Sequence, residues 1–145
     1  MAFSADGCGA AEVSGPVTII RRTTMDPEAV KKDILGFMYA ERMKSALLVA
    51  GQLLDVLGSL DEAERSGAFK ILGSFVKAVG TEMRLAAHVM GASDWHGLDA
   101  ELNLMEGHAR LRETEAARQQ LSRTLSRVTT LSGRLMSSLK DAGLL

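Results

Sequence analysis

The distribution of proline is the strongest constraint on what this chain can fold into. The chain has two prolines, Pro16 and Pro27, so residues 28–145 contain none. Because proline interrupts helices, its absence lets long helices form over that range. Hydrophobic residues make up 46% of the chain and aromatic residues only 4%, a balance that favours helices over strands. We therefore predict an all-α fold, with a flexible N-terminal tail at 1–25 and a single helical bundle domain at 26–145.

Capping signals mark the first two predicted helices. Asp26 precedes a proline that suits the first helical position, so the first helix is predicted over 27–58. Ser59 and Glu62 have the spacing of a capping box. This spacing predicts a tight turn followed by a second helix over 62–90, so that the two helices form an antiparallel hairpin.

The third predicted helix covers residues 94–142 and would be about 73 Å long, against about 48 and 44 Å for the first two. Either this helix breaks, near Gly97 or Gly107, or its C-terminal half projects past the hairpin. Residues 46–57 are also apolar or small on nearly every side, which is typical of a buried helix. Both features predict a three-helix protomer that completes a four-helix-type or larger bundle by dimerisation.

The end of the third predicted helix carries an apolar stripe with helical spacing. The stripe consists of Leu121, Leu125, Val128, Leu131, Leu135 and Leu139. A basic face accompanies it, formed by Arg123, Arg127 and Arg134. Residues 116–140 contain no acidic residue, whereas the acidic residues of this helix come earlier. We interpret the stripe and the arginines as a site for a partner helix or a second copy. The alternative for the arginines is an ordinary solvated face.

Four glycines lie inside the first two predicted helices, where each costs about 1 kcal/mol relative to alanine. They are Gly51, Gly58, Gly73 and Gly80. Within each helix the two glycines are seven residues apart and therefore share a face. We interpret them as helix-packing positions that let the two helices approach closely, with Gly73 near Leu48. The alternative is that the helices tolerate glycines that have no role.

No residue pattern typical of catalysis or metal binding occurs. The three histidines lack the Glu-x-x-His and His-x-x-x-His spacings of helical metal sites. The single cysteine, Cys8, lies in the tail, far in sequence from any histidine. Glu41 and Glu82 would lie near each other in the hairpin, but charged residues at the rim of a bundle are far commoner than acid–base pairs. We predict no catalytic, metal or cofactor-binding residues and no enzymatic activity.

Charge and hydropathy narrow the range of partners. The net charge of −1 gives no overall field that would attract nucleic acid. The most apolar run, residues 45–60, is interrupted by Gln52 and Asp55 and is too short for a membrane span. The first ten residues lack the basic and apolar regions of a signal peptide. These observations predict a cytoplasmic protein without a membrane span.

These features predict a non-enzymatic protein–protein interaction module, such as an adaptor, a scaffold or a chaperone-like bundle. It would bind a partner helix or a second copy through its C-terminal helix. In layout, a helical hairpin followed by a long helix with an apolar stripe resembles small export chaperones of flagellar and secretion systems. The alternative hypothesis is a small-ligand-binding or sensory bundle with an apolar pocket.

Overall fold

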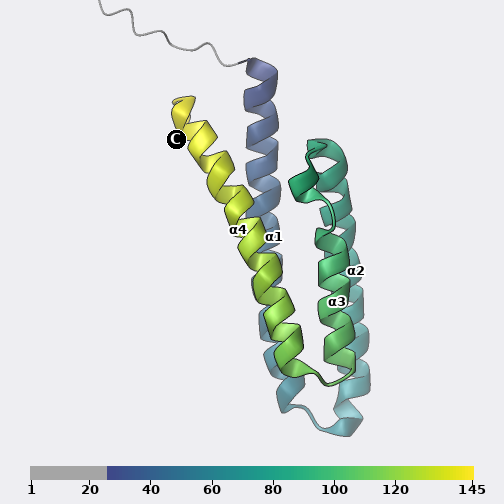
Figure 1. Cartoon of the computed structure of the whole chain (residues 1–145). Coiled ribbons are helices and arrows are strands. Elements are labelled where there is room, and N and C mark those ends of the chain that lie inside the picture. Colours follow the sequence, from purple (N-terminus) through teal and green to yellow (C-terminus); the bar gives the residue numbers. More distant parts are fainter. Residues whose placement is uncertain (1–25) are drawn as a thin grey trace, which may run out of the picture.

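The computed structural model describes residues 26–145, and within this range the chain is helical without any strand. The elements are α1 (Pro27–Ser59), α2 (Glu62–Met90), the short 3-10 helix η1 (Ser93–Trp95), α3 (Leu98–Arg110) and α4 (Thr114–Asp141). The four α-helices run alternately in opposite directions and lie side by side (Figure 1). The predicted all-α class is confirmed. The predicted tail at 1–25 lies outside the described residues.

Local capping explains where α1 and α2 begin and end. Asp26 caps α1 by accepting a hydrogen bond from the backbone N–H of Glu28 at 3.2 Å. The capping box of α2 lies two residues later than predicted. Asp61 accepts from the backbone N–H of Glu64 at 2.9 Å, and the Glu64 carboxylate accepts from the Asp61 N–H. Ser59 instead donates its hydroxyl to a carbonyl of α1. The chain leaves α2 at Gly91, whose φ of 64° suits glycine.

The single helix predicted over 94–142 is wrong, because the chain breaks twice in that range. Gly97, with φ of 81°, separates η1 from α3. It is one of the two glycines near which the sequence indicated a possible break. The second break is a tight turn between α3 and α4, where Arg112 takes a φ of 61°. The Arg112 guanidinium forms an ion pair with Glu62 at the start of α2. After this turn, α4 runs back along α3, so the fourth helix of the bundle comes from the same chain and not from a second copy.

The helices form a ring in which α1 contacts α4 more extensively than it contacts α2. Hydrogen bonds follow the α1–α4 seam along its length. Ser138 donates to Asp33 at 2.5 Å near one end, and Arg118 donates to Asp55 at 2.6 Å near the other. At the end of the bundle where α2 stops, α1 and α4 extend further than α2 and α3 (Figure 1). The α1–α2 contact, by contrast, is the least extensive of the four contacts between neighbouring α-helices.

The core lies along the axis of the bundle and consists mainly of aliphatic and methionine side chains from all four α-helices. Its largest fully buried side chains are Met43, Leu47, Leu72, Val76, Met83, Leu98, Leu102, Met105, Thr124 and Val128. Trp95 of η1 is buried as well and closes the core at the end where α2 stops.

Candidate functional site: an apolar groove between α1 and α2

The C-terminal stripe predicted to bind a partner lies in the chain's own core. Leu121, Val128, Leu131 and Leu139 are buried, and Leu125 and Leu135 are partly buried against the same core. The stripe packs on α1 and α3 because α4 folds back after the turn at Arg112. The described structure therefore leaves little of the stripe for a partner.

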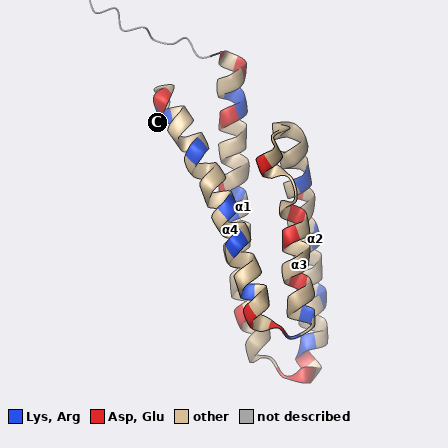
Figure 2. Cartoon of the chain, viewed as in Figure 1, with Lys and Arg blue, Asp and Glu red and all other residues tan. Residues whose placement is uncertain are grey.

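Two of the three predicted basic residues also bind within the chain. Arg127 pairs with Glu101 of α3 and donates to the backbone carbonyls of Asp94 and His96 at 3.0 and 3.1 Å. Arg134 pairs with the Asp94 carboxylate at 2.8 Å. The acidic side of α3 and the basic side of α4 thus face each other inside one molecule (Figure 2).

Arg123, the third predicted basic residue, is exposed on α4.

The four predicted helix-packing glycines do not lie between α1 and α2. A methyl group at Gly51 would contact Leu121 of α4 at 3.5 Å. Methyl groups at Gly73 and Gly80 would meet side chains that include residues of α3, and Gly58 faces open space. The glycines have other neighbours because α1 packs chiefly on α4, and α2 on α3. The α1–α2 register itself is close to the predicted one, since Arg42 pairs with Glu82.

Among the glycines of the described helices, Gly36 has the least room for a side chain, and the sequence did not indicate this position. A methyl group there would lie 2.6 Å from the Met90 methyl carbon of α2 and 3.1 Å from Leu135 of α4. Three helices therefore meet at this glycine. Gly36 is buried, as is Gly80, and the contacts that crowd Gly36 depend on packing that no local pattern reports.

The ionisable groups of the described residues form scattered ion pairs. No group of three metal-ligating side chains occurs within residues 26–145. The strongest local effect concerns Glu41, whose pKa is lowered by a hydrogen bond from Lys44 at 2.7 Å and by one from Ser132. Glu82 is the carboxylate that the sequence analysis paired with Glu41. It forms an exposed ion pair with Arg42 at 2.6 Å.

The most distinctive surface feature is an apolar hollow between α1 and α2, close to the turn that joins them. It has a volume of about 480 Å³. Its lining is apolar except for Glu64, which already takes part in the capping box of α2. The lining residues are Leu53, Val56, Leu57, Leu60, Glu64, Gly67, Ala68, Ile71 and Leu72.

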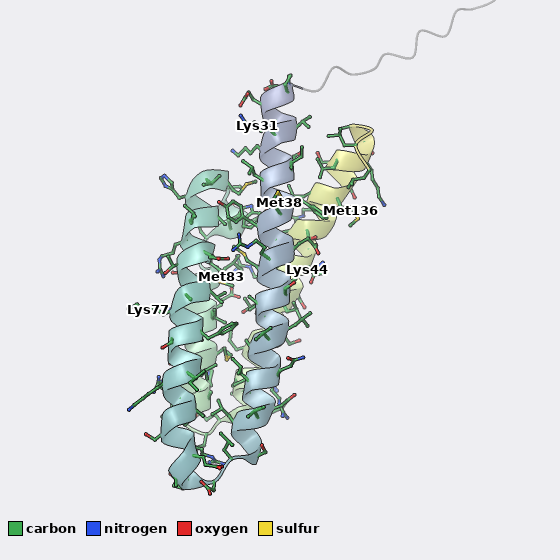
Figure 3. The ribbon with its side chains drawn as sticks, turned by 180° about the vertical axis from the view of Figure 1, so that it is seen from behind. Lys31, Met38, Lys44, Lys77, Met83 and Met136 are labelled. Atoms are coloured by element: carbon green, nitrogen blue, oxygen red, sulfur yellow. The ribbon has the colours of Figure 1, made fainter. Side chains whose placement is uncertain are left out.

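A second hollow of about 460 Å³ lies further along the same two helices. It is lined by Glu41, Arg42, Ser45, Ala46, Phe75, Ala78, Val79 and Glu82. The Arg42–Glu82 ion pair joins α1 to α2 at this hollow. We call the two hollows together the α1–α2 groove. Figure 3 shows the side of the molecule on which α1 and α2 lie in front of the other two helices.

Large apolar side chains stand exposed along this groove. Ile71 of α2 is 65% exposed, and Met38 and Val56 of α1 are 57% and 53% exposed. The sequence already showed that residues 46–57 are apolar on nearly every side, but that pattern predicted a helix surrounded by protein. In the structure, one side of α1 remains uncovered.

The ends of the groove differ in charge. Asp61, Glu62 and Glu64 lie at the turn between α1 and α2, where Figure 2 shows acidic residues. Lys31 lies near the opposite end of α1, and Figure 3 shows it beyond the level at which α2 stops. Its acidic neighbours there are Glu28 and Asp33, of which Asp33 accepts a hydrogen bond from Ser138 of α4. The groove is therefore apolar next to its acidic end, is crossed by the Arg42–Glu82 ion pair further along, and has Lys31 beyond its other end.

None of residues 26–145 belongs to a helix that is long and apolar enough to cross a membrane. Comparison of the chain with protein-family models, curated proteins and solved structures finds no match. The chemistry of the α1–α2 groove is therefore the basis for a functional assignment.

Proposed function

We propose that the protein is a non-enzymatic, cytoplasmic interaction module whose α1–α2 groove binds an amphipathic helix of a partner polypeptide. The exposed apolar seam between α1 and α2 carries this proposal. Monomeric proteins seldom leave large apolar patches in water, and such patches mark interaction sites. A chain with a single cysteine also suits a reducing compartment.

The dimensions of the groove suit a helix. The two hollows are centred about 12 residues apart on α1, which corresponds to about 18 Å. An amphipathic helix places large side chains on one face at intervals of three, four, seven and eleven residues, so it can fill both hollows at once. A small ligand would occupy only one.

The lining also favours a helix over a polar small molecule. Ligand pockets usually contain a few polar groups that converge on the ligand and fix its orientation. The larger hollow offers only Glu64, and its carboxylate already caps α2. The second hollow has polar side chains, but Arg42 pairs with Glu82, and Glu41 accepts hydrogen bonds from Lys44 and Ser132. The small-ligand hypothesis therefore has the volume it needs, but the polar groups already bind within the chain.

The charges define the partner further. Asp61, Glu62 and Glu64 stand at one end of the groove, so a partner helix with lysine or arginine at the matching end gains electrostatic complementarity. Such pairs at the rim of an interface act mainly on orientation and on the rate of association. The expected occupant is a helix with one apolar face and a basic end.

A photo-crosslinking amino acid placed at Val56, in cells that make the protein, tests this proposal. Leu104, on the outer face of α3, gives a matched control because it is 51% exposed, against 53% for Val56. We expect Val56 to yield a discrete crosslink to an amphipathic helical segment, and Leu104 to yield none. Ile71→Glu in the same protein should abolish the crosslink, because it puts a charge in the groove.

Binding is then measured directly with the crosslinked segment as a synthetic peptide. The wild-type protein should bind it at least about tenfold more tightly than Ile71→Glu does. If the crosslinks at Val56 are as diffuse as those at Leu104, or if Ile71→Glu binds the peptide as well as the wild type, the proposal is wrong.

A further inference from the structure

The chemistry expected of the partner helix also describes α1 itself. We propose that the occupant of the α1–α2 groove is a second copy of this chain, and that the two copies pack these faces together in antiparallel orientation about a two-fold axis. This inference rests on the proposed function and names its partner.

The exposed side of α1 has the required pattern. At 100° per residue, Lys31, Met38, Val49 and Val56 lie within about 20° of one another around the helix. The last three are exposed apolar residues, and Lys31 supplies the basic end. One copy therefore presents both an apolar groove with an acidic end and a helix with an apolar face and a basic end.

A two-fold axis brings these complementary ends together. The exposed apolar part of α1 runs from Leu35 to Val56, so its middle lies near residue 46. Antiparallel packing about that level places Lys31 of each copy opposite the acidic turn at residues 61–64 of the other. Parallel packing would place like charges together at both ends, which disfavours it. Since the same patch serves both copies, the assembly closes as a dimer.

The area of the face suits a stable dimer. Its length from Leu35 to Val56 is about 32 Å at 1.5 Å per residue. Two helices whose axes are 8–10 Å apart present a face about 20 Å wide. The product is about 600 Å² per copy, or about 1,200 Å² in total. This lies at the lower end of the range for specific, stable interfaces and above most incidental contacts.

Sedimentation equilibrium of the purified full-length chain from 0.5 to 50 µM tests the stoichiometry. We expect the wild type to show twice the monomer mass at the upper concentrations. Val56→Glu and Ile71→Lys should each weaken dimerisation at least about tenfold, because each buries a charge in the interface. Leu104→Glu is the matched control and should remain dimeric. Circular dichroism of each variant confirms that it is folded, which is expected because all three sites are exposed.

Disulfide crosslinking tests the orientation, with Cys8→Ser as the background. In that background we make two single-cysteine proteins, Lys31→Cys and Ala63→Cys. Antiparallel packing predicts that oxidation of an equal mixture gives mainly the mixed disulfide between them. Parallel packing predicts that each protein crosslinks mainly to itself, and that result would overturn the proposed arrangement.

The outcomes separate this inference from the function on which it rests. A wild-type chain that stays monomeric up to 50 µM overturns the self-association, and so does a Leu104→Glu variant that dissociates as much as Val56→Glu. If the photo-crosslink at Val56 then identifies a helix of a different protein, the interaction module stands with another partner. If Val56 yields neither a second copy nor another helix, both proposals are wrong.

Discussion

Replacing Gly36 with alanine measures how closely α1, α2 and α4 meet. The added methyl group would lie 2.6 Å from the methyl carbon of Met90, a distance that requires Met90 to move. Met90 is buried, so its end has little room. Overpacking of this kind typically costs about 1–3 kcal/mol. Alanine also favours the helix over glycine by about 1 kcal/mol, so the net loss of unfolding free energy is expected to be about 0–2 kcal/mol.

Gly133→Ala is the control that isolates the packing effect. Gly133 lies inside α4 with no atom within 4 Å of an added methyl group. It should therefore gain the full helix preference of about 1 kcal/mol. The difference between the two variants, about 1–3 kcal/mol, reports the crowding alone, because the helix preference cancels. Urea unfolding followed by circular dichroism gives both values.

A double-mutant cycle with Met90→Ala locates the strain. Without the Met90 thioether, Gly36→Ala should become more favourable than it is in the wild type, with Leu135 at 3.1 Å as the remaining close neighbour. If Gly36→Ala stabilises the wild-type protein as much as Gly133→Ala does, the three helices do not meet at Gly36 as the structure indicates.

Three further perturbations test other parts of the fold. Because the pKa of Glu41 is lowered, its carboxylate stabilises the folded state at pH values above the ordinary pKa of the group, 4.5. This contribution is lost as the pH falls through the folded-state pKa. Glu41→Gln should therefore lose less stability than the wild type between pH 5 and 3, and equal losses would contradict the role of the Lys44 hydrogen bond. Arg127→Met should speed amide hydrogen exchange in η1, because Arg127 donates to the backbone carbonyls of Asp94 and His96. Unchanged exchange would show that the burial of Trp95 is enough to hold η1 in place. Leu102→Ala should lower the unfolding free energy by about 2–5 kcal/mol, and a loss below about 1 kcal/mol would mean that the core collapses around the site.

The ends of α1 and α2 could be predicted because their signals are local. Each signal acts within one turn of helix. The signals are Asp26 with the following proline, the acidic residues after Ser59, and Gly91. The break between α3 and α4 has no such signal. Its turn contains neither glycine nor proline, and Arg112 is held there partly by an ion pair to Glu62, fifty residues away in sequence.

The candidate site was missed for a related reason. Apolar spacing shows which side of α4 avoids water, but not whether the covering helix belongs to this chain. The stripe from Leu121 to Leu139 was therefore assigned to a partner, although α1 and α3 cover it. Conversely, the all-round apolar pattern of residues 46–57 predicted complete burial, and the structure leaves Val49 and Val56 exposed.

The extensive seam between α1 and α4 has a consequence for biosynthesis. α1 is translated well before α4, although α4 provides much of its cover. Until residues 114–141 have been translated, the buried side of α1, including Leu47, has no α4 to cover it. Exposed apolar surface on an incomplete chain promotes aggregation. A chain that stops at the turn around Arg112 is therefore expected to need a chaperone, although α1, α2 and α3 are already complete.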